Sequence, residues 1–543
     1  MSVANEVDFI VVGAGSAGCV LANRLSQNGR HTVALLEAGP PDRNFWIHLP
    51  IGYGKTMWDP RVNWQFYTEP EQTMAGRRIY WPRGRVLGGS SSINGLIVVR
   101  GQREDYAHWE SLGNPGWGWD GVLPYFRRLE TNPTFPNDPL HGQDGPLHVS
   151  GIKQKHEIVE AVIDAAGQCG VPRTADFNGA RQEGVGYYQL TTRNGWRMSS
   201  AVAYLRPARN RHNLSIHCNA QATRILFDGR RANGVEYISQ GRRHSLRARR
   251  GVVLSAGAVQ SPQLLMLSGI GPAGQLSGLG LPVLADLPGV GGNLQDHLQI
   301  RLIYRLKRPI STNDALRSLG GRMRIGLEWL LHRSGPLAIG INQCGLFTRV
   351  LPESHTPDIQ FHIATLSADM AGGKVHDFPG ITLSVCQLRP QSTGTIALAS
   401  ADPLQPPRIL ANYLTAADDQ RCAVAAMKFA RRLSGTAPLS DYIAEEVLPG
   451  SPRATDGDLL DFARNHGATI FHPAGTCRMG PAGDAMTVVD PRLRVKGIPN
   501  LWIADCSIMP TLVSGNTNIP TIMIAEKAAD LIQEDIDQDA IKQ

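Results

Sequence analysis

The clearest pattern of apolar and polar positions lies near the start of the chain. Residues 9–12 form a short apolar run rich in β-branched side chains, which predicts a buried strand. A glycine-rich turn follows and opens a segment in which Val20, Leu21 and Leu25 recur with helical spacing, until Asn28-Gly29 ends it. Residues 32–36 form a second apolar strand that finishes in Glu37. The pattern therefore predicts a β-turn-α-β unit.

The turn of this unit reads Gly13, Ala14, Gly15, Ser16, Ala17 and Gly18. Gly13 permits the tight turn, Gly15 lets the backbone approach a pyrophosphate, and Gly18 lets the helix pack closely on the strand. The helix N-terminus adds N–H donors and positive potential for the phosphates. Glu37, 19 residues after Gly18 and followed by Ala38, lies where a carboxylate accepts hydrogen bonds from ribose hydroxyls. We therefore expect a bound dinucleotide, and the acid disfavours NADP because it would repel the extra phosphate.

Beyond this unit the regular pattern is interrupted. Residues 40–80 are rich in Pro, Trp, Tyr and Asn, which predicts a long irregular excursion. Short strands are predicted at residues 213–226, 251–256, 358–363, 381–385, 395–398 and 500–505. Residues 257–271 combine a turn with a helix that Ser261 and Pro262 are expected to start, and residues 520–532 predict another helix. The mixture of strands and helices indicates an α/β class.

The chain has 543 residues, of which 42% are hydrophobic. This length allows a large core and predicts two or more domains. The dinucleotide unit begins near the first residue without a preceding apolar segment, and no uninterrupted apolar run reaches the roughly 18 residues that a membrane span requires. We therefore expect a cytoplasmic protein without a signal peptide.

The charge balance is basic, with a net charge of +7 and an isoelectric point near 9.0. The basic residues occur in short groups, such as 242–243 and 247–250, without a long basic tail or an aromatic-interleaved stripe. We expect no nucleic acid partner, while weak peripheral association with the inner membrane stays open. The eight cysteines show no CxxC pair and no metal-ligand spacing, so reduced thiols and no metal site are expected.

A second glycine-rich stretch follows the irregular excursion. It begins at Gly84 and reaches the run Gly88, Gly89, Ser90, Ser91, Ser92, Ile93, Asn94 and Gly95. Such a loop is flexible and rich in backbone and hydroxyl donors, which suits a contact along a phosphate chain or at the edge of a flavin ring. A plain loop has the same composition, so its meaning depends on the motifs that accompany it.

Four further motifs accompany this loop. Residues 257–271 read GAVQSPQLLMLSGIG, residues 290–297 read VGGNLQDH, residues 471–480 read FHPAGTCRMG, and residues 505–520 contain DCSIMP and NTNIP. Together with residues 84–94 they extend over nearly the whole chain. In content and order the set resembles the glucose–methanol–choline family of FAD-dependent oxidoreductases.

The resemblance implies a fold that is α/β in class, α+β overall. A Rossmann-type FAD-binding domain, at residues 1–151, 213–299 and 466–543, would be interleaved with a substrate-binding domain. The substrate-binding domain, at residues 152–212 and 300–465, would be built on an antiparallel sheet.

The resemblance also implies FAD as the cofactor. The second loop would contact it through Gly88, Gly89, Ser90, Asn94 and Gly95, the backbone at Ala222 and Thr223 would meet the adenine, and Asp505, Asn518 and Pro520 would lie at the flavin end. A helix N-terminus directed at the flavin would stabilise negative charge there. Some relatives tether FAD through a histidine in the second loop; Asn94 stands at that position here, so non-covalent FAD is expected.

Oxidation of an alcohol needs a hydride acceptor, a base for the hydroxyl proton and a polar group for the developing alkoxide. Histidine suits the base role because its ordinary pKa of about 6.5 is close to working pH. His472 matches the family's catalytic histidine, and Asn516 matches the second member of the pair, which is His or Asn among relatives. His297, in the motif at residues 290–297, is interpreted as structural.

Substrate choice is weakly encoded. Choline-specific relatives bind the quaternary ammonium with a carboxylate, and Gln343 is assigned to that position here, which favours neutral primary alcohols. Ile470 and Phe471, beside the histidine, are expected to border the substrate pocket, and Ile470 would crowd oxygen near the flavin.

The primary hypothesis is oxidation of a primary alcohol to the aldehyde by hydride transfer to flavin N5, with electrons passed to a quinone or another non-nicotinamide acceptor. The alternatives are an oxidase that reduces oxygen to hydrogen peroxide, an FAD-containing lyase on the same scaffold, and a flavin-binding protein without catalysis. The oligomeric state is left open by the sequence.

Overall fold

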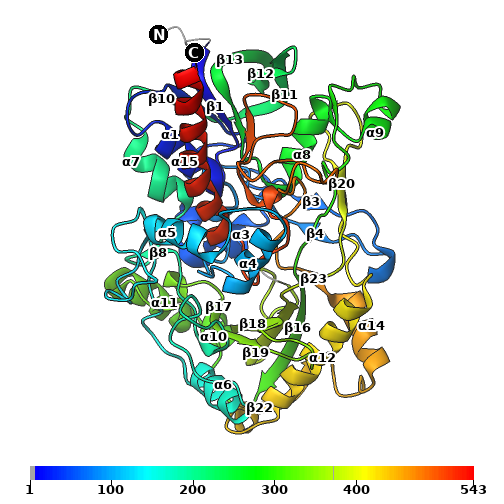
Figure 1. Ribbon diagram of the computed structural model, residues 1–543. Helices are drawn as coiled ribbons and strands as arrows, with labels where there is room; N and C mark the ends of the chain where they lie inside the picture. Colours follow the sequence, from blue (N-terminus) through cyan, green and yellow to red (C-terminus); the bar gives the residue numbers. More distant parts are fainter. Residues whose placement is uncertain (1–5, 371, 543) are drawn as a thin grey trace.

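The computed structural model describes residues 6–370 and 372–542. Two large sheets organise it, one in the upper and one in the lower half of the view in Figure 1, with helices around both. One sheet contains parallel strands and the other is antiparallel, which confirms the predicted α/β class.

The first sheet has the strand order β10 (Leu214–His217), β2 (Val33–Leu36), β1 (Glu6–Val12), β13 (Arg242–Leu254), β12 (Arg231–Ser239) and β11 (Ala220–Asp228), with β24 (Leu501–Ile503) also beside β13. β10, β2, β1, the end of β13 and β24 are parallel. All four residues of β2 are buried, which is typical of a parallel strand with both faces covered. The predicted unit is present as β1, α1 (Ser16–Leu25) and β2, and α1 packs on α15 (Asn518–Lys542).

β13 explains why only its last residues, 251–256, were predicted as a strand. Its first half pairs with β12 in an antiparallel meander and carries mostly exposed polar side chains, three of them arginines. Its last four residues are buried and pair with β1 and β24. The run of apolar residues therefore predicted only the end of the strand, which lies inside the core.

The second sheet has the strand order β22 (Ile443–Leu448), β16 (Leu298–Leu306), β19 (Gly380–Gln387), β18 (Ile359–Ala364), β17 (Asn342–Thr348) and β7 (Gly184–Tyr187), with β23 (Ala468–Thr469) beside the start of β16. Every pairing in it is antiparallel. The predicted strands at 358–363 and 381–385 are β18 and β19. The predicted strand at 395–398 is β20 (Thr395–Ala397), which pairs with β21 (Arg408–Leu410) outside this sheet.

The remaining helices are α2 (Phe45–His48), α3 (Tyr53–Thr56), α4 (Arg103–Ser111), α5 (Trp119–Leu129), α6 (Glu157–Gln168), α7 (Arg206–Ala208), α8 (Gly257–Leu267), α9 (Ala273–Gly278), α10 (Thr312–Arg317), α11 (Leu319–His332), α12 (Ala417–Ser434), α13 (Leu439–Tyr442) and α14 (Asp456–His466). Short strand pairs are β3 (Phe66–Tyr67) with β4 (Tyr80–Trp81), β5 (Glu130–Thr131) with β6 (Leu147–His148), β8 (Thr192–Arg193) with β9 (Trp196–Arg197), and β14 (Ile270–Gly271) with β15 (Ala285–Asp286). As predicted, residues 40–80 contain only short elements.

The predicted start of α8 was wrong. The helix begins at Gly257, four residues before Ser261, and Pro262 lies inside it. Proline lacks the N–H that would bond the carbonyl of Ala258 in the preceding turn. That carbonyl instead accepts a hydrogen bond from the Thr476 hydroxyl at 2.7 Å, so the proline leaves no buried oxygen without a partner.

The strands of the first sheet all come from the ranges assigned to the FAD-binding domain. Those of the second sheet come from the other ranges, apart from β23 and the first residues of β16. The domain boundaries themselves stay a prediction. Within residues 6–370 and 372–542, no helix has the length and apolar character needed to cross a membrane, and no cluster of His, Cys, Asp and Glu could hold a metal ion.

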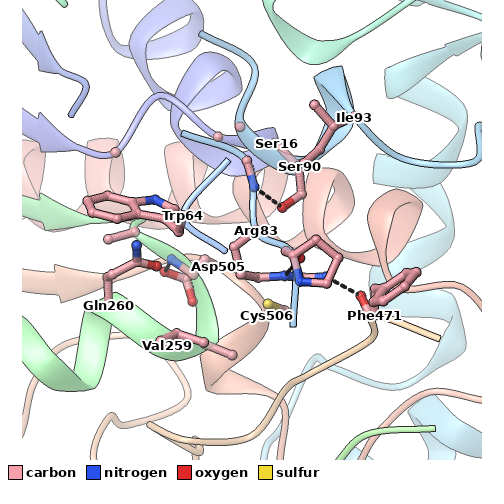
Figure 2. Close-up of a pocket in the computed structure, with 18 of the residues that line it drawn as sticks. Ser16, Trp64, Arg83, Ser90, Ile93, Val259, Gln260, Phe471, Asp505 and Cys506 are labelled. Atoms are coloured by element: carbon pink, nitrogen blue, oxygen red, sulfur yellow. Dashed lines mark hydrogen bonds between the residues drawn. The ribbon is translucent and has the colours of Figure 1, made fainter. Parts of the chain in front are cut away.

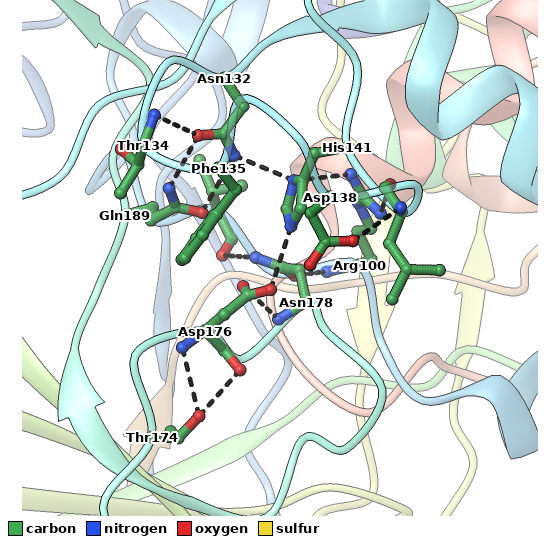
Figure 3. Close-up of polar contacts among 12 residues, drawn as sticks. Arg100, Asn132, Thr134, Phe135, Asp138, His141, Thr174, Asp176, Asn178 and Gln189 are labelled. Atoms are coloured by element: carbon green, nitrogen blue, oxygen red, sulfur yellow. Dashed lines mark hydrogen bonds and ion pairs between the residues drawn. The ribbon is translucent and has the colours of Figure 1, made fainter.

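A cluster of buried charges stabilises the loops between the two sheets (Figure 3). Glu130 accepts from Arg100 at 2.5 Å and lies 2.7 Å from His141 Nδ1, while His141 Nε2 lies 3.0 Å from Asp176. Burial lowers the pKa of His141, but the hydrogen bonds to Asp176 and Glu130 outweigh burial and raise the pKa to about 9. The imidazolium therefore joins two carboxylates from distant loops at neutral pH.

Replacing His141 by Gln should destabilise the fold in a pH-dependent manner. The folded pKa of about 9 exceeds the unfolded value of about 6.5, so the stabilisation is complete below about pH 6.5 and is lost as pH rises through about 9. At neutral pH we expect His141→Gln to cost about 1–3 kcal/mol, and the difference from the wild type should shrink above about pH 9. Thermal unfolding across this range measures it, with exposed His108→Gln as the control. A difference that is constant with pH would contradict the assignment.

Candidate active site

A cavity of about 350 Å³ lies where the two sheets meet. Its walls include the ends of β1 and β2, the start of α1, the second glycine-rich loop, and residues of β16, β17 and β18. The predicted site residues that line it are Gly13, Gly15, Ser16, Ala17, Glu37, Ala38, Gly89, Ser90, Asn94, Gly95, Ala222, Ile470, Phe471, His472, Asp505, Asn516 and Asn518. The structure thus brings segments from both ends of the chain to one cavity.

The start of α1 forms one end of this cavity. Gly15 is the N-cap residue and no side chain caps the helix, so its first N–H groups remain available to a ligand. A Cβ atom on Gly15 would have only the Ser255 carbonyl near it, at 3.9 Å, whereas a Cβ on Gly18 would lie 1.8 Å from the Gly13 carbonyl. Gly18 is therefore required for packing of the helix on its turn, and the space beside Gly15 is open.

Glu37 faces the same end of the cavity from the end of β2. One carboxylate oxygen accepts from Ala14 N at 3.0 Å and the other from Gly39 N at 2.8 Å. Burial raises the pKa of Glu37 to about 7, although both hydrogen bonds oppose this rise. The carboxylate is therefore fixed by the glycine-rich turn and has further lone pairs for a ligand.

The second glycine-rich loop packs directly on the first. A Cβ on Gly89 would lie 2.6 Å from the Gly15 Cα, so this approach requires glycine. Ser90 lines the cavity and accepts from Gly84 N at 3.1 Å (Figure 2). Ser91 and Ser92 instead donate to carbonyls of the same loop, at 2.6 Å and 2.7 Å. One serine faces the ligand space and the other two hold the loop.

Asn94, Asp505 and Asn518 are fixed by their own contacts. The Asn94 side-chain oxygen accepts from Arg197 at 2.7 Å. Asp505 accepts from Gly257 N and from the Ser261 hydroxyl, at 2.8 Å and 2.6 Å. Asn518 starts α15 and accepts from the Ser16 hydroxyl at 2.8 Å, which joins the first turns of α15 and α1.

Phe471 holds the histidine turn in an unusual backbone conformation. Its φ of 73° is in the left-handed region, which costs free energy for a non-glycine residue. Two contacts maintain it: Arg83 donates to the Phe471 carbonyl at 2.8 Å (Figure 2), and Phe471 N donates to the Thr469 hydroxyl at 2.7 Å. The next N–H, of His472, donates to Asp296 at 2.8 Å. The position of His472 is therefore determined by its backbone.

A chain of hydrogen bonds then determines the tautomer of His472. His297 Nε2 lies 2.9 Å from the Leu388 carbonyl, which can only accept, so His297 carries its proton there. His297 Nδ1 must then accept from His472 Nδ1 at 3.0 Å. The remaining nitrogen of His472, Nε2, is left without a proton and lies 3.1 Å from the Asn516 side-chain nitrogen.

The Asn516 amide is oriented by a similar argument. Its oxygen accepts from the Gln360 side chain at 3.0 Å, so its nitrogen faces His472 Nε2. Burial lowers the pKa of His472 well below its ordinary value, and the nearby His297, His362 and Arg83 lower it further. Burial also lowers the pKa of His297 to about 4. The pair His472 and Asn516 therefore presents a neutral imidazole lone pair and an N–H donor to the cavity.

Five predicted site residues do not line the cavity. Gly18 and Gly88 support the turns, Thr223 donates to the Glu236 carbonyl at 3.1 Å, and Pro520 lies in the first turn of α15. The Gln343 side chain turns to the Thr365 hydroxyl at 2.9 Å, while its neighbour Asn342 faces the cavity. Adjacent strand residues point to opposite faces, so an assignment that is wrong by one residue selects the wrong face.

Several cavity residues were not predicted from the sequence: Tyr53, Arg83, Gln299, Arg301, Asn342 and His362. Burial lowers the pKa of His362 to about 3. Neither of its ring nitrogens makes a hydrogen bond of acceptable geometry, although the Asn516 amide is close enough to raise its pKa. His297 is in a recognised motif, but its contact with His472 joins residues far apart in the chain.

Comparison with known proteins agrees with this geometry. The models of the GMC oxidoreductase family match residues 7–299 and 390–525. An alcohol dehydrogenase [acceptor] of Pseudomonas putida is 42% identical over 98% of this chain and 96% of its own, and the mitochondrial choline dehydrogenase of Mus musculus is 43% identical over 97% and 90%. Formate oxidase of Aspergillus oryzae, whose structure concerns FAD modification, superposes with a TM-score of 0.90 at 26% identity over 98% of both chains. The chain belongs to the GMC oxidoreductase family.

Proposed function

We propose that this protein oxidises a primary alcohol to the aldehyde with FAD, held without a covalent bond, and passes the electrons to a quinone or another non-nicotinamide acceptor. The observation that carries the proposal is the unprotonated His472 Nε2 at the cavity, 3.1 Å from the Asn516 amide nitrogen. The relatives named alcohol dehydrogenase [acceptor] and choline dehydrogenase support the same class of reaction.

The residues present fit FAD. The uncapped N-terminus of α1 and the open space beside Gly15 suit a pyrophosphate, and the buried Glu37 carboxylate suits a ribose. The cavity continues from there to His472 at the other end. When bound, the flavin supplies the hydride acceptor for the alcohol carbon. Asn94, which accepts from Arg197, stands where a tethering histidine occurs in some relatives, and this supports non-covalent binding.

His472 and Asn516 would then act together on the alcohol oxygen. His472 Nε2 accepts the hydroxyl proton, and the Asn516 N–H donates to the oxygen as negative charge develops on it. His297 keeps His472 Nδ1–H in place, so the lone pair stays on Nε2, the nitrogen that faces the cavity and the Asn516 amide. Burial keeps the imidazole neutral, so the base is ready to accept at neutral pH.

The electron acceptor separates the proposal from its alternatives. The relative with 42% identity over nearly the full chain is a dehydrogenase, whereas the named structural neighbour with 26% identity is an oxidase. Oxygen is therefore the second candidate acceptor, and release of hydrogen peroxide at the full turnover rate would identify it. Anaerobic addition of alcohol tests the lyase alternative, because a lyase leaves the flavin oxidised.

Glu37→Gln should weaken FAD binding. Both carboxylate oxygens accept from backbone N–H groups, so an amide would place its NH₂ against one of those donors. An unsatisfied buried donor costs about 1–3 kcal/mol, which corresponds to roughly tenfold to a hundredfold weaker FAD affinity. Titration of the apoprotein with FAD, followed by flavin fluorescence, measures the change, and the exposed Glu104→Gln on α4 is the control. Equal FAD affinity in the two variants would contradict the assigned role.

His472→Ala should slow flavin reduction by alcohol while FAD stays bound. Loss of a general base costs about a hundredfold to ten-thousandfold in rate. Anaerobic stopped-flow mixing with a panel of primary alcohols gives the rate, and the visible spectrum gives the FAD content. His108→Ala, at an exposed position on α4, should keep the wild-type rate. Failure of every alcohol to reduce the wild-type flavin at full FAD content would overturn the proposed function.

A further inference from the structure

The substrate end of the cavity contains a guanidinium without an acidic partner. Arg301 and Gln299 lie two residues apart on β16, so their side chains share the face that lines the cavity. Arg301 donates to the Gln299 side-chain oxygen at 3.3 Å and to the Asp369 carbonyl at 3.4 Å, both long contacts. No ion pair joins it to an acidic side chain anywhere in the described ranges. Most of its donors are therefore free.

The charge of Arg301 affects other groups that line the cavity. Its charge acts on Tyr53 and on His362, both of which line the cavity. His362 in turn lowers the pKa of His472. The cavity acids, Glu37 and Asp505, are instead bound to the first glycine-rich turn and to the start of α8. The substrate end thus carries positive charge and no carboxylate among its described residues.

We propose that Arg301 and Gln299 form a subsite for a carboxylate, so the preferred substrates are primary alcohols that carry an anionic group away from the hydroxyl. A guanidinium keeps its charge when buried and pairs with carboxylates through two parallel hydrogen bonds. Arg301 is partly buried, and withdrawing a charge from water without a partner is costly, so an anionic substrate removes part of that cost. A quaternary ammonium such as choline would meet like charge. This inference rests on the proposed function, because it names the substrate class of the same site.

The test compares ω-hydroxy carboxylates with neutral primary alcohols of equal chain length. We expect the wild type to prefer the hydroxy acid by about tenfold or more in kcat/KM, chiefly through KM. Arg301→Gln should bring the ratio of kcat/KM for hydroxy acid to kcat/KM for neutral alcohol close to one, and Arg301→Lys should keep part of the preference. Benzoate, which cannot be oxidised, should perturb the flavin absorbance of the wild type but not of Arg301→Gln.

The outcomes distinguish failure of the anionic subsite from failure of the proposed function. The anionic subsite is refuted, and the proposed function stands, if the wild type oxidises neutral alcohols with the same kcat/KM as hydroxy acids. The same conclusion follows if Arg301→Gln leaves the ratio of these two kcat/KM values unchanged. If no alcohol of either kind reduces the flavin, the proposed function fails. The benzoate titration still reports on the subsite in that case, because it needs no turnover.

An independent observation concerns the outer surface of α11. Five large apolar side chains on this helix are more than half exposed: Leu319, Met323, Leu327, Leu330 and Leu331. Their spacing of i, i+4, i+8, i+11 and i+12 places them on one face, which we call the apolar stripe. Ile325, on the opposite face, is buried. Figure 1 shows α11 at the edge of the molecule. The exposed fractions of the five side chains show that the stripe faces solvent.

Cations and aromatic rings surround the apolar stripe. Arg322 and Arg324 are exposed on its two flanks. At the end of the helix Arg333 lies 4.2 Å from the Trp329 ring centroid, and Trp329 contacts Trp196 edge to face at 4.7 Å. Trp196 also contacts Phe45, which is 53% exposed. Exposed leucines bordered by tryptophan and arginine are typical of helices that lie in a membrane interface.

We propose that the apolar stripe docks on an anionic lipid bilayer, with α11 parallel to the membrane plane. The flanking arginines complement anionic headgroups, whereas a second copy related by symmetry would oppose arginine with arginine. The chain continues from α11 to Asn342, which lines the cavity, so docking would bring this wall close to lipid-dissolved molecules. An apolar quinone is such a molecule, and this last consequence rests on the proposed function.

Cosedimentation with vesicles tests the docking without any turnover. The wild-type holoenzyme should bind vesicles of phosphatidylglycerol with phosphatidylcholine and bind pure phosphatidylcholine weakly. Leu327→Asp with Leu330→Asp should lower the partition at least tenfold, because both leucines would lose their burial in lipid. Arg322→Gln and Arg324→Gln should each lower it about fivefold on the anionic vesicles alone.

The matched control places acids at exposed apolar positions away from α11. Val283→Asp with Met486→Asp, at residues that are 40% and 44% exposed, should bind as the wild type does. Failure of the wild type to bind anionic vesicles, or equal binding by the α11 variant, would overturn the docking proposal. A wild-type dimer in light scattering that the α11 variant dissociates would assign the stripe to contact between copies instead.

Discussion

Two consecutive residues hold the histidine turn by its backbone and by its ring. Asp296 accepts from His472 N, and its other oxygen receives the hydroxyls of Thr469 and Tyr413. His297 accepts from the His472 ring. Because β16 begins at the next residue, the strand that carries the cavity-facing Gln299 and Arg301 directly follows the two residues that hold His472. One segment of the chain therefore fixes both His472 and this wall of the cavity, and the first sheet meets both there.

How much of this arrangement could be predicted depends on how far apart in the sequence the interacting residues lie. The β-turn-α-β unit is encoded by local periodicity and by glycines that its own turn and helix packing require. It was therefore predicted, with Glu37 at the end of the second strand. The motif residues His472 and Asn516 were recognised by resemblance, and their 3.1 Å contact agrees with that pairing. The tautomer depends on the Leu388 carbonyl, which is a backbone atom in an unremarkable stretch. No pattern in the sequence identifies such an acceptor.

β16 and Gln343 show a second reason for the differences. In β16 the cavity-facing positions are Gln299 and Arg301, and polar residues at a cavity look the same in sequence as residues at the outer surface. The strand therefore lacked the apolar run by which buried strands were found elsewhere. Gln343 was assigned to the pocket by resemblance, whereas the next residue back, Asn342, faces the cavity in the structure. Successive side chains of a strand point to opposite faces of the sheet. Resemblance alone therefore cannot assign a pocket side chain unless the register of the strand with its neighbours is known.

Burial leaves the substrate end of the cavity with few charges, and those of its described lining residues are positive. It lowers the pKa values of His297 and His362 to about 4 and about 3, and that of His472 well below normal. Arg83 and Arg301 stay cationic because a guanidinium does not lose its proton in proteins. Fixed positive charge attracts the negative charge that develops on an alcohol oxygen, whereas it opposes the positive charge that an imidazole gains when it accepts the proton. In the proposed reaction, the charge of Arg83, which lowers the pKa of His472, would therefore also stabilise the developing alkoxide.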